Sequence, residues 1–175
     1  KDDNFEIREY EPKILAQVTV KGNFNNASSK GFKVLADYIF GNNISIDGNS
    51  KIDMTAPVIA ETASKKIEMT APVIAEGSDS EWLISFVMPK EYSLKTLPKP
   101  NNKNITITSL PKEKYAVIVF SGLVRESNYN EQIKLLNDFI ISKNLKIIDQ
   151  VQIARYNPPW TLPFFRRNEL MIRIN

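Results

Sequence analysis

Residues 5–40 read FEIREYEPKILAQVTVKGNFNNASSKGFKVLADYIF, and the spacing of their apolar side chains changes once. Residues 5–8 and 14–20 alternate between apolar and polar or small side chains, which predicts two half-buried strands. From residue 28 onward the apolar residues are spaced as on one face of an amphipathic helix: Phe32, Leu35, Ala36, Ile39 and Phe40. The segment therefore predicts a strand-strand-helix order.

Turn and cap residues mark the ends of these elements. Pro12 is expected to turn the chain between the two strands, and Gly22 to end the second one. Ser28 or Ser29 can cap the start of the helix, and Gly41 stands where a helix-ending glycine belongs.

The same order of patterns returns in the second half of the chain. Strands are expected at 105–108 and 115–120, with Pro111 between them as the turn. The second helix is expected to start at Asn128, which with Glu131 resembles a capping box, and to end near Asn144. The remaining strands are expected within 51–76 and at 82–88, 151–156 and 170–174. Each half thus reads strand, strand, helix, strand, strand.

Two pseudo-symmetric halves of this kind predict an α+β fold. We expect a distorted antiparallel β-barrel or open cup of about eight strands with two packed helices. The halves, at about 1–90 and 104–175, are joined by a Pro/Asn/Lys linker, and residues 1–175 are interpreted as a single domain. Two separate ferredoxin-like units are the alternative, which the short linker and the small halves disfavour.

A nearly exact repeat lies between the first helix and the strand at 82–88. Residues 51–61 read KIDMTAPVIAE, and residues 66–76 read KIEMTAPVIAE. The prolines in both copies indicate edge strands or strand ends. The copies could pair as a hairpin, or one could be a core strand and the other an extruded loop. A slippage duplication without its own function is equally compatible with the pattern.

The composition excludes several kinds of chemistry. The 175 residues include no histidine and no cysteine, so we expect no Cys/His zinc site, no Ser-His-Asp triad and no disulfide. Lys and Arg exceed Asp and Glu by three and are scattered, so no nucleic-acid partner is expected. No apolar run approaches the roughly 18 residues of a membrane span. The visible chain begins at Lys1, and a signal peptide could precede it, so cytoplasmic and periplasmic locations both stay open.

The most unusual stretch is the loop at 157–165, NPPWTLPFF, which is rich in proline and aromatic residues where loops are ordinarily polar. Its prolines lower the entropy cost of holding rings at a surface. Arg166 and Arg167 follow directly. Rings beside guanidinium groups suit a flat apolar ligand that carries carboxylates. The alternative is a lid over the barrel end, with solvated or ion-paired arginines.

Other residues offer weaker candidates for function. Glu169 is expected to form a structural salt bridge with an arginine, because nothing indicates the raised pKa that a general base needs. The methionines and tyrosines could supply soft or phenolate ligands to iron, but core packing is the favoured interpretation. These residues are Met54, Met69, Met88, Met171, Tyr10, Tyr38, Tyr92, Tyr115, Tyr129 and Tyr156. No catalytic residue and no metal site is predicted.

A set of short motifs runs in order through nearly the whole chain. They are FEIREY at 5–10, GF at 31–32, KIDMTAPV at 51–58 and its copy at 66–73, SFVMP at 85–89, LPKP at 97–100, FSG at 120–122, ARYNPP at 154–159 and RRNE at 166–169. Together they resemble the SOUL heme-binding protein family. The doubled KIxMTAPV is similar to its bacterial branch.

The resemblance implies two βαββ-type repeats that form a distorted barrel with two helices. It also implies non-catalytic binding of heme or another tetrapyrrole in a cleft between the first helix and the loop before the last strand. The residues that it suggests for ligand binding are Phe32, Lys33, Leu35, Ile39, Trp160, Leu162, Phe164, Arg166 and Arg167. Lys33 and the arginines would lie near the propionates. The fold is similar to that of bacterial effector-binding domains of transcription regulators.

Two other functions stay open, and protein partners are not predicted. The chain could bind a different apolar small molecule, or it could dock a protein through the loop at 157–165. If it binds heme, it does so without the usual His or Cys ligand to iron. Binding would then depend on apolar stacking and arginine–propionate contacts, or on a Met, Tyr or Lys ligand, and we expect it to be weak and exchangeable.

Overall fold

The computed structural model describes residues 4–45, 50–54, 57–62, 81–157 and 160–175. Its elements divide between two compact units. The α1 unit comprises Lys13–Leu110, and the α2 unit comprises Lys1–Pro12 together with Pro111–Asn175. Among the described residues, no helix is long and apolar enough to cross a membrane.

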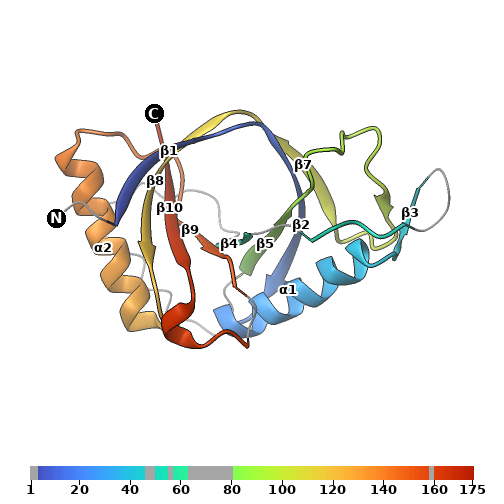
Figure 1. Ribbon diagram of the computed structural model, residues 1–175, viewed down its shortest axis with the longest axis horizontal. Coiled ribbons are helices and arrows are strands. Elements are labelled where there is room, and N and C mark those ends of the chain that lie inside the picture. The colour runs from blue at the N-terminus through green and yellow to red at the C-terminus, as the bar shows by residue number, and fades with distance from the viewer. Residues whose placement is uncertain (1–3, 46–49, 55–56, 63–80, 158–159) are drawn as a thin grey trace. The chain divides into compact units, whose positions relative to one another are not determined.

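The α1 unit is a four-stranded antiparallel sheet covered by one helix. The sheet order is β4-β5-β2-β7, and α1 lies against β2 and β5 (Figure 1). A two-stranded ladder, β3-β6, accompanies it. The bounds are β2 Lys13–Lys21, α1 Phe24–Ile39, β3 Asn43–Ile44, β4 Val58–Thr62, β5 Glu81–Val87, β6 Lys99–Pro100 and β7 Thr106–Leu110.

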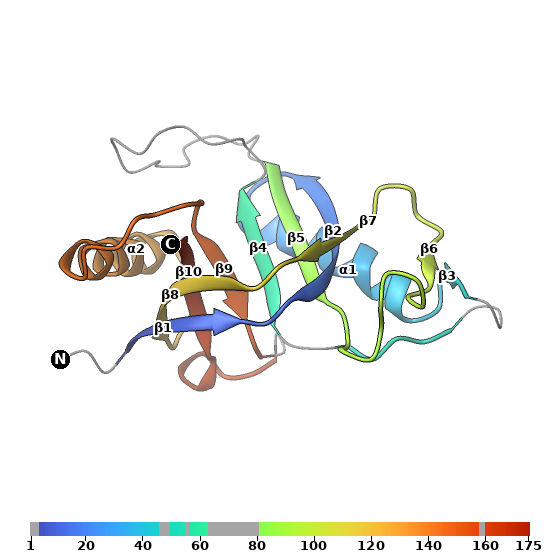
Figure 2. The same ribbon diagram turned by 90° about the horizontal axis from the view of Figure 1, so that it is seen from above.

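The α2 unit repeats this plan. Its sheet order is β1-β8-β10-β9, again antiparallel, and α2 lies against β8 and β10 (Figure 2). A short 3-10 helix, η1, precedes the last strand. The bounds are β1 Phe5–Tyr10, β8 Glu113–Phe120, α2 Glu126–Ser142, β9 Gln152–Arg155, η1 Pro163–Phe165 and β10 Asn168–Ile174. The α+β class, the eight antiparallel strands and the two helices are confirmed.

The sequence halves, 1–90 and 104–175, have different bounds from these two units. The first strand of each sequence half joins the other unit's sheet, since β1 pairs with β8 and β7 pairs with β2. Pro12 and Pro111 were expected to turn the chain between two strands, and each lies where the chain passes from one unit to the other. Proline cannot donate a ladder hydrogen bond, so it fits such a break. That residues 1–175 form one domain stays a prediction.

Both helix starts differ from their predictions. Helix α1 begins earlier than the serines indicated, because the Asn23 side chain accepts a hydrogen bond from the Asn26 backbone N–H at 3.0 Å and caps the helix. Helix α2 begins before Asn128, without a side-chain cap. Asn128 instead donates to the Leu123 carbonyl at 3.2 Å, so the expected capping box is wrong. Gly41, with φ +122°, follows α1 as predicted.

Helix α1 packs on the face of β5 that carries Trp82 and Phe86. The Phe32 ring lies 5.3 Å from the Phe86 ring, and the Phe24 ring lies 4.9 Å from the Trp82 ring. The helix lies close to the sheet at Gly31, where an added Cβ would lie 2.5 Å from Ile84 Cγ1. Glycine at this position therefore allows the helix to contact the sheet.

Two further segments refine the sequence interpretation. The presumed linker is packed, because Leu97 is buried and the Pro98 carbonyl accepts a 2.7 Å hydrogen bond from the Tyr38 hydroxyl. In the first copy of the repeat, β4 begins directly after Pro57, as expected for a proline at a strand end, and pairs with β5. The second copy, 66–76, lies outside the described residues, so the hairpin and loop alternatives stay open.

Candidate functional site

The sheet of the α2 unit has one face covered by its helix and one face that carries polar side chains. On the covered face, the Phe5 ring stacks on the Phe139 ring of α2 at 4.8 Å. Because side chains alternate along a strand, the neighbouring positions of β1 and β10 point to the opposite face. That face holds Arg8 and Tyr10 of β1 together with Glu169, which lies far from them in the sequence.

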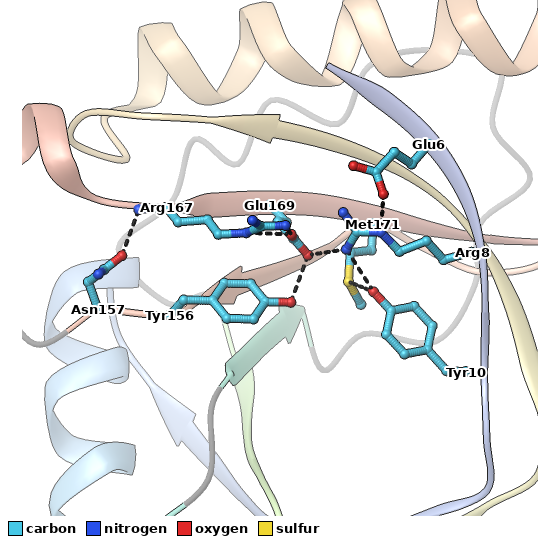
Figure 3. A network of polar contacts seen from close by, with 8 residues as sticks. All are labelled: Glu6, Arg8, Tyr10, Tyr156, Asn157, Arg167, Glu169 and Met171. Atoms are coloured by element: carbon cyan, nitrogen blue, oxygen red, sulfur yellow. Dashed lines mark hydrogen bonds and ion pairs between the residues drawn. The ribbon is translucent and has the colours of Figure 1, made fainter. Parts of the chain in front are cut away.

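Glu169 is the centre of a polar network on this face (Figure 3). Its side chain is fully buried. Its Oε2 accepts hydrogen bonds from Arg8 Nη1 at 2.9 Å and from the Tyr156 hydroxyl at 2.7 Å. Its Oε1 accepts from Nε and Nη2 of Arg167, at 3.0 Å and 2.7 Å. The predicted structural salt bridge is confirmed, and two arginines share it. A buried carboxylate with this set of donors is fully satisfied.

The two arginines are in turn held by their neighbours. Arg8 donates from Nε to Glu6 at 2.6 Å, and this hydrogen bond raises the pKa of Arg8 above its usual value, which keeps the guanidinium charged. Arg167 lies over the Tyr156 ring, with its guanidinium carbon 5.4 Å from the ring centroid. Its backbone N–H donates to the Asn157 side chain at 2.6 Å. The Arg167 side chain is therefore fixed in direction although it is half exposed.

An open hollow of about 370 Å³ lies beside this network, within the α2 unit. Arg166 and Arg167 line it together with a phenylalanine ring from η1. The full lining is Asn4, Val119, Phe120, Ser121, Phe165, Arg166 and Arg167. The floor of this region is tied together at Gly122, whose carbonyl accepts from Asn168 at 2.9 Å and whose N–H donates to Pro163 at 2.9 Å.

The loop residues that were predicted to bind a ligand directly precede the lining residues Phe165, Arg166 and Arg167 in the chain. Their side chains are exposed to solvent. Trp160 is 84% exposed, and Leu162 and Phe164 are more than half exposed. The Phe164 and Phe165 rings lie 4.5 Å apart. These exposed side chains therefore do not form a packed lid, which was the alternative interpretation of the loop. The ion-paired arginine that this alternative included is present, because Arg167 binds Glu169.

The four residues predicted on the first helix lie in the other unit. Leu35 and Ile39 are fully buried in the core of the α1 unit, and Phe32 packs on Phe86. Only Lys33 is exposed. The helix face that was expected to line a ligand cleft therefore faces its own sheet, because the same apolar periodicity serves a core and a cleft equally well.

Sequence reasoning missed several residues of this region. Arg8 was seen only as part of a family motif, and Tyr156 was seen as a possible phenolate ligand or core residue but not as a partner of Glu169. Phe165 was seen in the loop but left out of the expected ligand-binding set. The signal that could have found Arg8 is the position of Glu6, Arg8 and Tyr10 at every second residue, which places three polar groups on one face of the strand.

The methionines and tyrosines considered as alternative iron ligands differ in burial. Met88 and Met171 are buried in the two cores, as the packing interpretation predicted, while Met54 is half exposed and Met69 lies outside the described residues. Met171 Sδ accepts a 3.7 Å contact from the Tyr10 hydroxyl. Burial raises the pKa of Tyr129 to about 12.

Tyr156 is expected to remain a phenol well above the usual tyrosine pKa of about 10. Burial raises its pKa first, and the hydrogen bond to the Glu169 carboxylate raises it further. A raised pKa in the folded state contributes stability that is present at neutral pH and is lost as pH rises through the folded value. The phenolate absorbance of wild type and Tyr156→Phe during alkaline titration measures this. If Tyr156→Phe shows one fewer tyrosine ionising near the usual pKa than wild type does, the raised pKa of Tyr156 is contradicted.

Comparisons with known proteins connect this geometry to a family. Residues 1–173 match the family described as SOUL heme-binding protein. The chain belongs to the SOUL family. Several motifs that carried the resemblance meet in the α2 unit: FEIREY supplies Arg8, FSG supplies Gly122, and RRNE supplies Arg167 and Glu169. The search of curated proteins returned no match.

Solved structures with the same fold have very different sequences. The C-terminal domain of EcmrR is 10% identical, with a TM-score of 0.71 over 98% of this SOUL protein and 96% of that chain. A hydrolase from Listeria innocua is 11% identical, with a TM-score of 0.65 over 98% and 92%. SAV2435 bound to tetraphenylphosphonium is 10% identical, with a TM-score of 0.52 over 98% and 93%. At such identities the likeness shows the fold alone.

Proposed function

We propose that this SOUL protein binds heme or another tetrapyrrole, without catalysis, in the hollow of the α2 unit. The observation that carries the proposal is the exposed Phe165 ring lining the same hollow as Arg166 and Arg167. A planar apolar ligand can stack on the ring while its carboxylates meet the guanidinium groups. Ligand pockets ordinarily measure about 300–1,000 Å³, so an open hollow of about 370 Å³ takes part of a tetrapyrrole and leaves the rest in solvent.

The charges around the hollow favour an anionic ligand over a cationic one. Residues 155–169 contain Arg155, Arg166 and Arg167, whereas Glu169 is their one acidic residue and already binds two arginines. The pKa of Arg155 is lowered first by burial and then by the charge of Arg166, so these two guanidinium groups lie close enough to repel each other. An apolar cation such as the tetraphenylphosphonium bound by SAV2435 is therefore a poorer fit than a ligand with carboxylates.

A hemin titration followed by the Soret absorbance tests the proposal. Wild type is expected to give a saturable shift, and Phe165→Ala and Arg166→Gln each to weaken binding by about tenfold, from loss of the stacked ring or of one charged contact. Phe40→Ala is the matched control, because Phe40 is an exposed ring at the end of α1. An absent shift, or equal affinities for all three variants and wild type, would overturn the proposal.

The lack of histidine and cysteine leads to a second expected result for the same site. An iron-free porphyrin should bind within about tenfold of hemin, which corresponds to about 1.4 kcal/mol, because stacking and propionate contacts do not involve the metal. Quenching of tryptophan fluorescence measures both ligands on one scale. A much stronger preference for the iron form would indicate a protein ligand to iron.

A different apolar ligand class is the second candidate, since the fold is shared with the tetraphenylphosphonium-binding SAV2435. A thermal-shift screen separates the candidates, because a ligand that binds the folded state raises the melting temperature. Stabilisation by apolar carboxylates and not by apolar cations would support the arginine-lined site.

A further inference from the structure

Four apolar side chains of one short loop stand in solvent on the α2 unit. This apolar loop consists of Trp160, Leu162, Phe164 and Phe165, which are 84%, 56%, 65% and 69% exposed. Single exposed apolar residues are ordinary, but an exposed cluster of large ones marks an interaction surface. Only part of it, Phe165, lines the hollow proposed for the tetrapyrrole.

Backbone hydrogen bonds hold the loop in this exposed form. The Phe165 N–H donates to the Leu162 carbonyl at 3.0 Å, and the Arg166 N–H donates to the Pro163 carbonyl at 3.1 Å. Arg166 Nε also donates to the Thr161 carbonyl at 2.8 Å, and the N–H of Gly122, which follows β8, donates to the Pro163 carbonyl at 2.9 Å. These hydrogen bonds fix the backbone between residues 161 and 166, from which Leu162, Phe164 and Phe165 project into solvent.

Positive charge lies directly beside the apolar loop. Arg166 and Arg167 follow it in the chain, and Arg155 is close enough for the charge of Arg166 to lower its pKa. Two carboxylates lie among these arginines: Glu169 is fully buried and bound by Arg8 and Arg167, and the half-exposed Glu6 binds Arg8. Arg8, Arg155, Arg166 and Arg167 outnumber them, so the net charge at the base of the loop is positive.

We propose that the apolar loop inserts into the interfacial layer of an anionic lipid bilayer, with the arginines at its base against the lipid headgroups. Tryptophan and phenylalanine suit the boundary between headgroups and acyl chains, and cationic side chains are attracted to anionic leaflets. Charge complementarity favours this occupant. The insertion is peripheral, involves a few side chains, and goes beyond the tetrapyrrole function.

Vesicle co-sedimentation tests this surface with the full chain. Wild type is expected to sediment with vesicles of equal parts phosphatidylcholine and phosphatidylglycerol, and far less with phosphatidylcholine alone. Added salt should weaken the binding, because it screens the headgroup charge. If the protein sediments with neither kind of vesicle, the inference is overturned. Docking of a protein would then be the remaining role for the loop.

The variants separate insertion from simple charge attraction. Trp160→Ala/Phe164→Ala should weaken sedimentation at least about tenfold, since two large side chains no longer leave water. Ile141→Ala is the matched control, because Ile141 is 72% exposed on α2 of the same unit. Sedimentation that is unchanged in the double variant, or reduced equally in the control, would overturn the inference. Equal melting temperatures establish that all variants are folded.

Tryptophan fluorescence tests whether Trp160 itself enters the bilayer. Trp82→Phe leaves Trp160 as the single tryptophan, and no described residue is within hydrogen-bonding distance of Trp82 Nε1, so that substitution removes no such bond. Mixed vesicles should shift the Trp160 emission to the blue and protect it from iodide. Hemin titration of the same protein runs in parallel. Hemin binding without vesicle binding refutes this inference alone, and the reverse result refutes the proposed function alone.

Discussion

Replacing Glu169 with alanine is expected to lower the free energy of unfolding by about 3 kcal/mol, near the lower end of the range for breaking a buried ion pair. The substitution leaves Arg8, Arg167 and the Tyr156 hydroxyl without their shared acceptor. The loss falls at the lower end because Arg167 is half exposed and can recover water. Urea unfolding of the variant and wild type measures the difference.

Two variants make this result specific. Glu169→Gln keeps an acceptor oxygen and the shape of the side chain, so it should lose about half as much stability as alanine. Glu9→Ala removes a carboxylate of the same unit whose ion pair with Lys112 is more than half exposed, and it should leave the unfolding midpoint nearly unchanged. Equal losses in Glu169→Ala and Glu9→Ala would show that the network does not stabilise the fold.

Gly31→Ala should destabilise the α1 unit by about 2 kcal/mol, even though alanine is the better helix former by about 1 kcal/mol. An added Cβ would lie 2.5 Å from Ile84 Cγ1 and 2.7 Å from Ile84 Cβ. Because Ile84 is fully buried on a central strand, neither it nor the helix can move aside cheaply. Overpacking therefore outweighs helix propensity.

Chemical unfolding of a small set of variants tests this contact. Ser29→Ala, on an exposed position of the same helix, is the control and should change stability by less than about 0.5 kcal/mol. Gly31→Ala/Ile84→Ala should lose less than the two single variants combined, since shortening Ile84 makes room for the new methyl group. A stabilised Gly31→Ala would show that the helix stands farther from the sheet than described.

Element type followed from the sequence because it depends on short-range periodicity. The alternation at 14–20 became β2, and the helical spacing of Leu35 and Ile39 became the buried face of α1. The predicted starts of the helices were wrong, because a polar side chain near a helix start can bind either the helix backbone or a neighbouring loop. Asn23 caps α1 although two serines stood closer to the apolar run, and Asn128 binds a loop carbonyl in place of a helix N–H.

The candidate site was predictable to the extent that it is local. Arg166 and Arg167 were expected beside the loop because they follow it, and they line the hollow with Phe165. The helix residues assigned to the same cleft were transferred by resemblance, and the structure places Leu35 and Ile39 in a core. A stripe of apolar residues indicates a buried face, but it does not say what covers that face.

The sequence alone determined the two helices, the antiparallel strands, the excluded His and Cys chemistry and the unusual loop, since each depends on residue type and near neighbours. Tertiary structure decided which strands share a sheet. Strand exchange brings β1 to β8, and this pairing carries Arg8 to Glu169 across most of the chain. A buried carboxylate must find its donors in space. The Arg167 contact is local and was predicted, whereas the separation of 161 residues between Arg8 and Glu169 hides their pairing from local pattern.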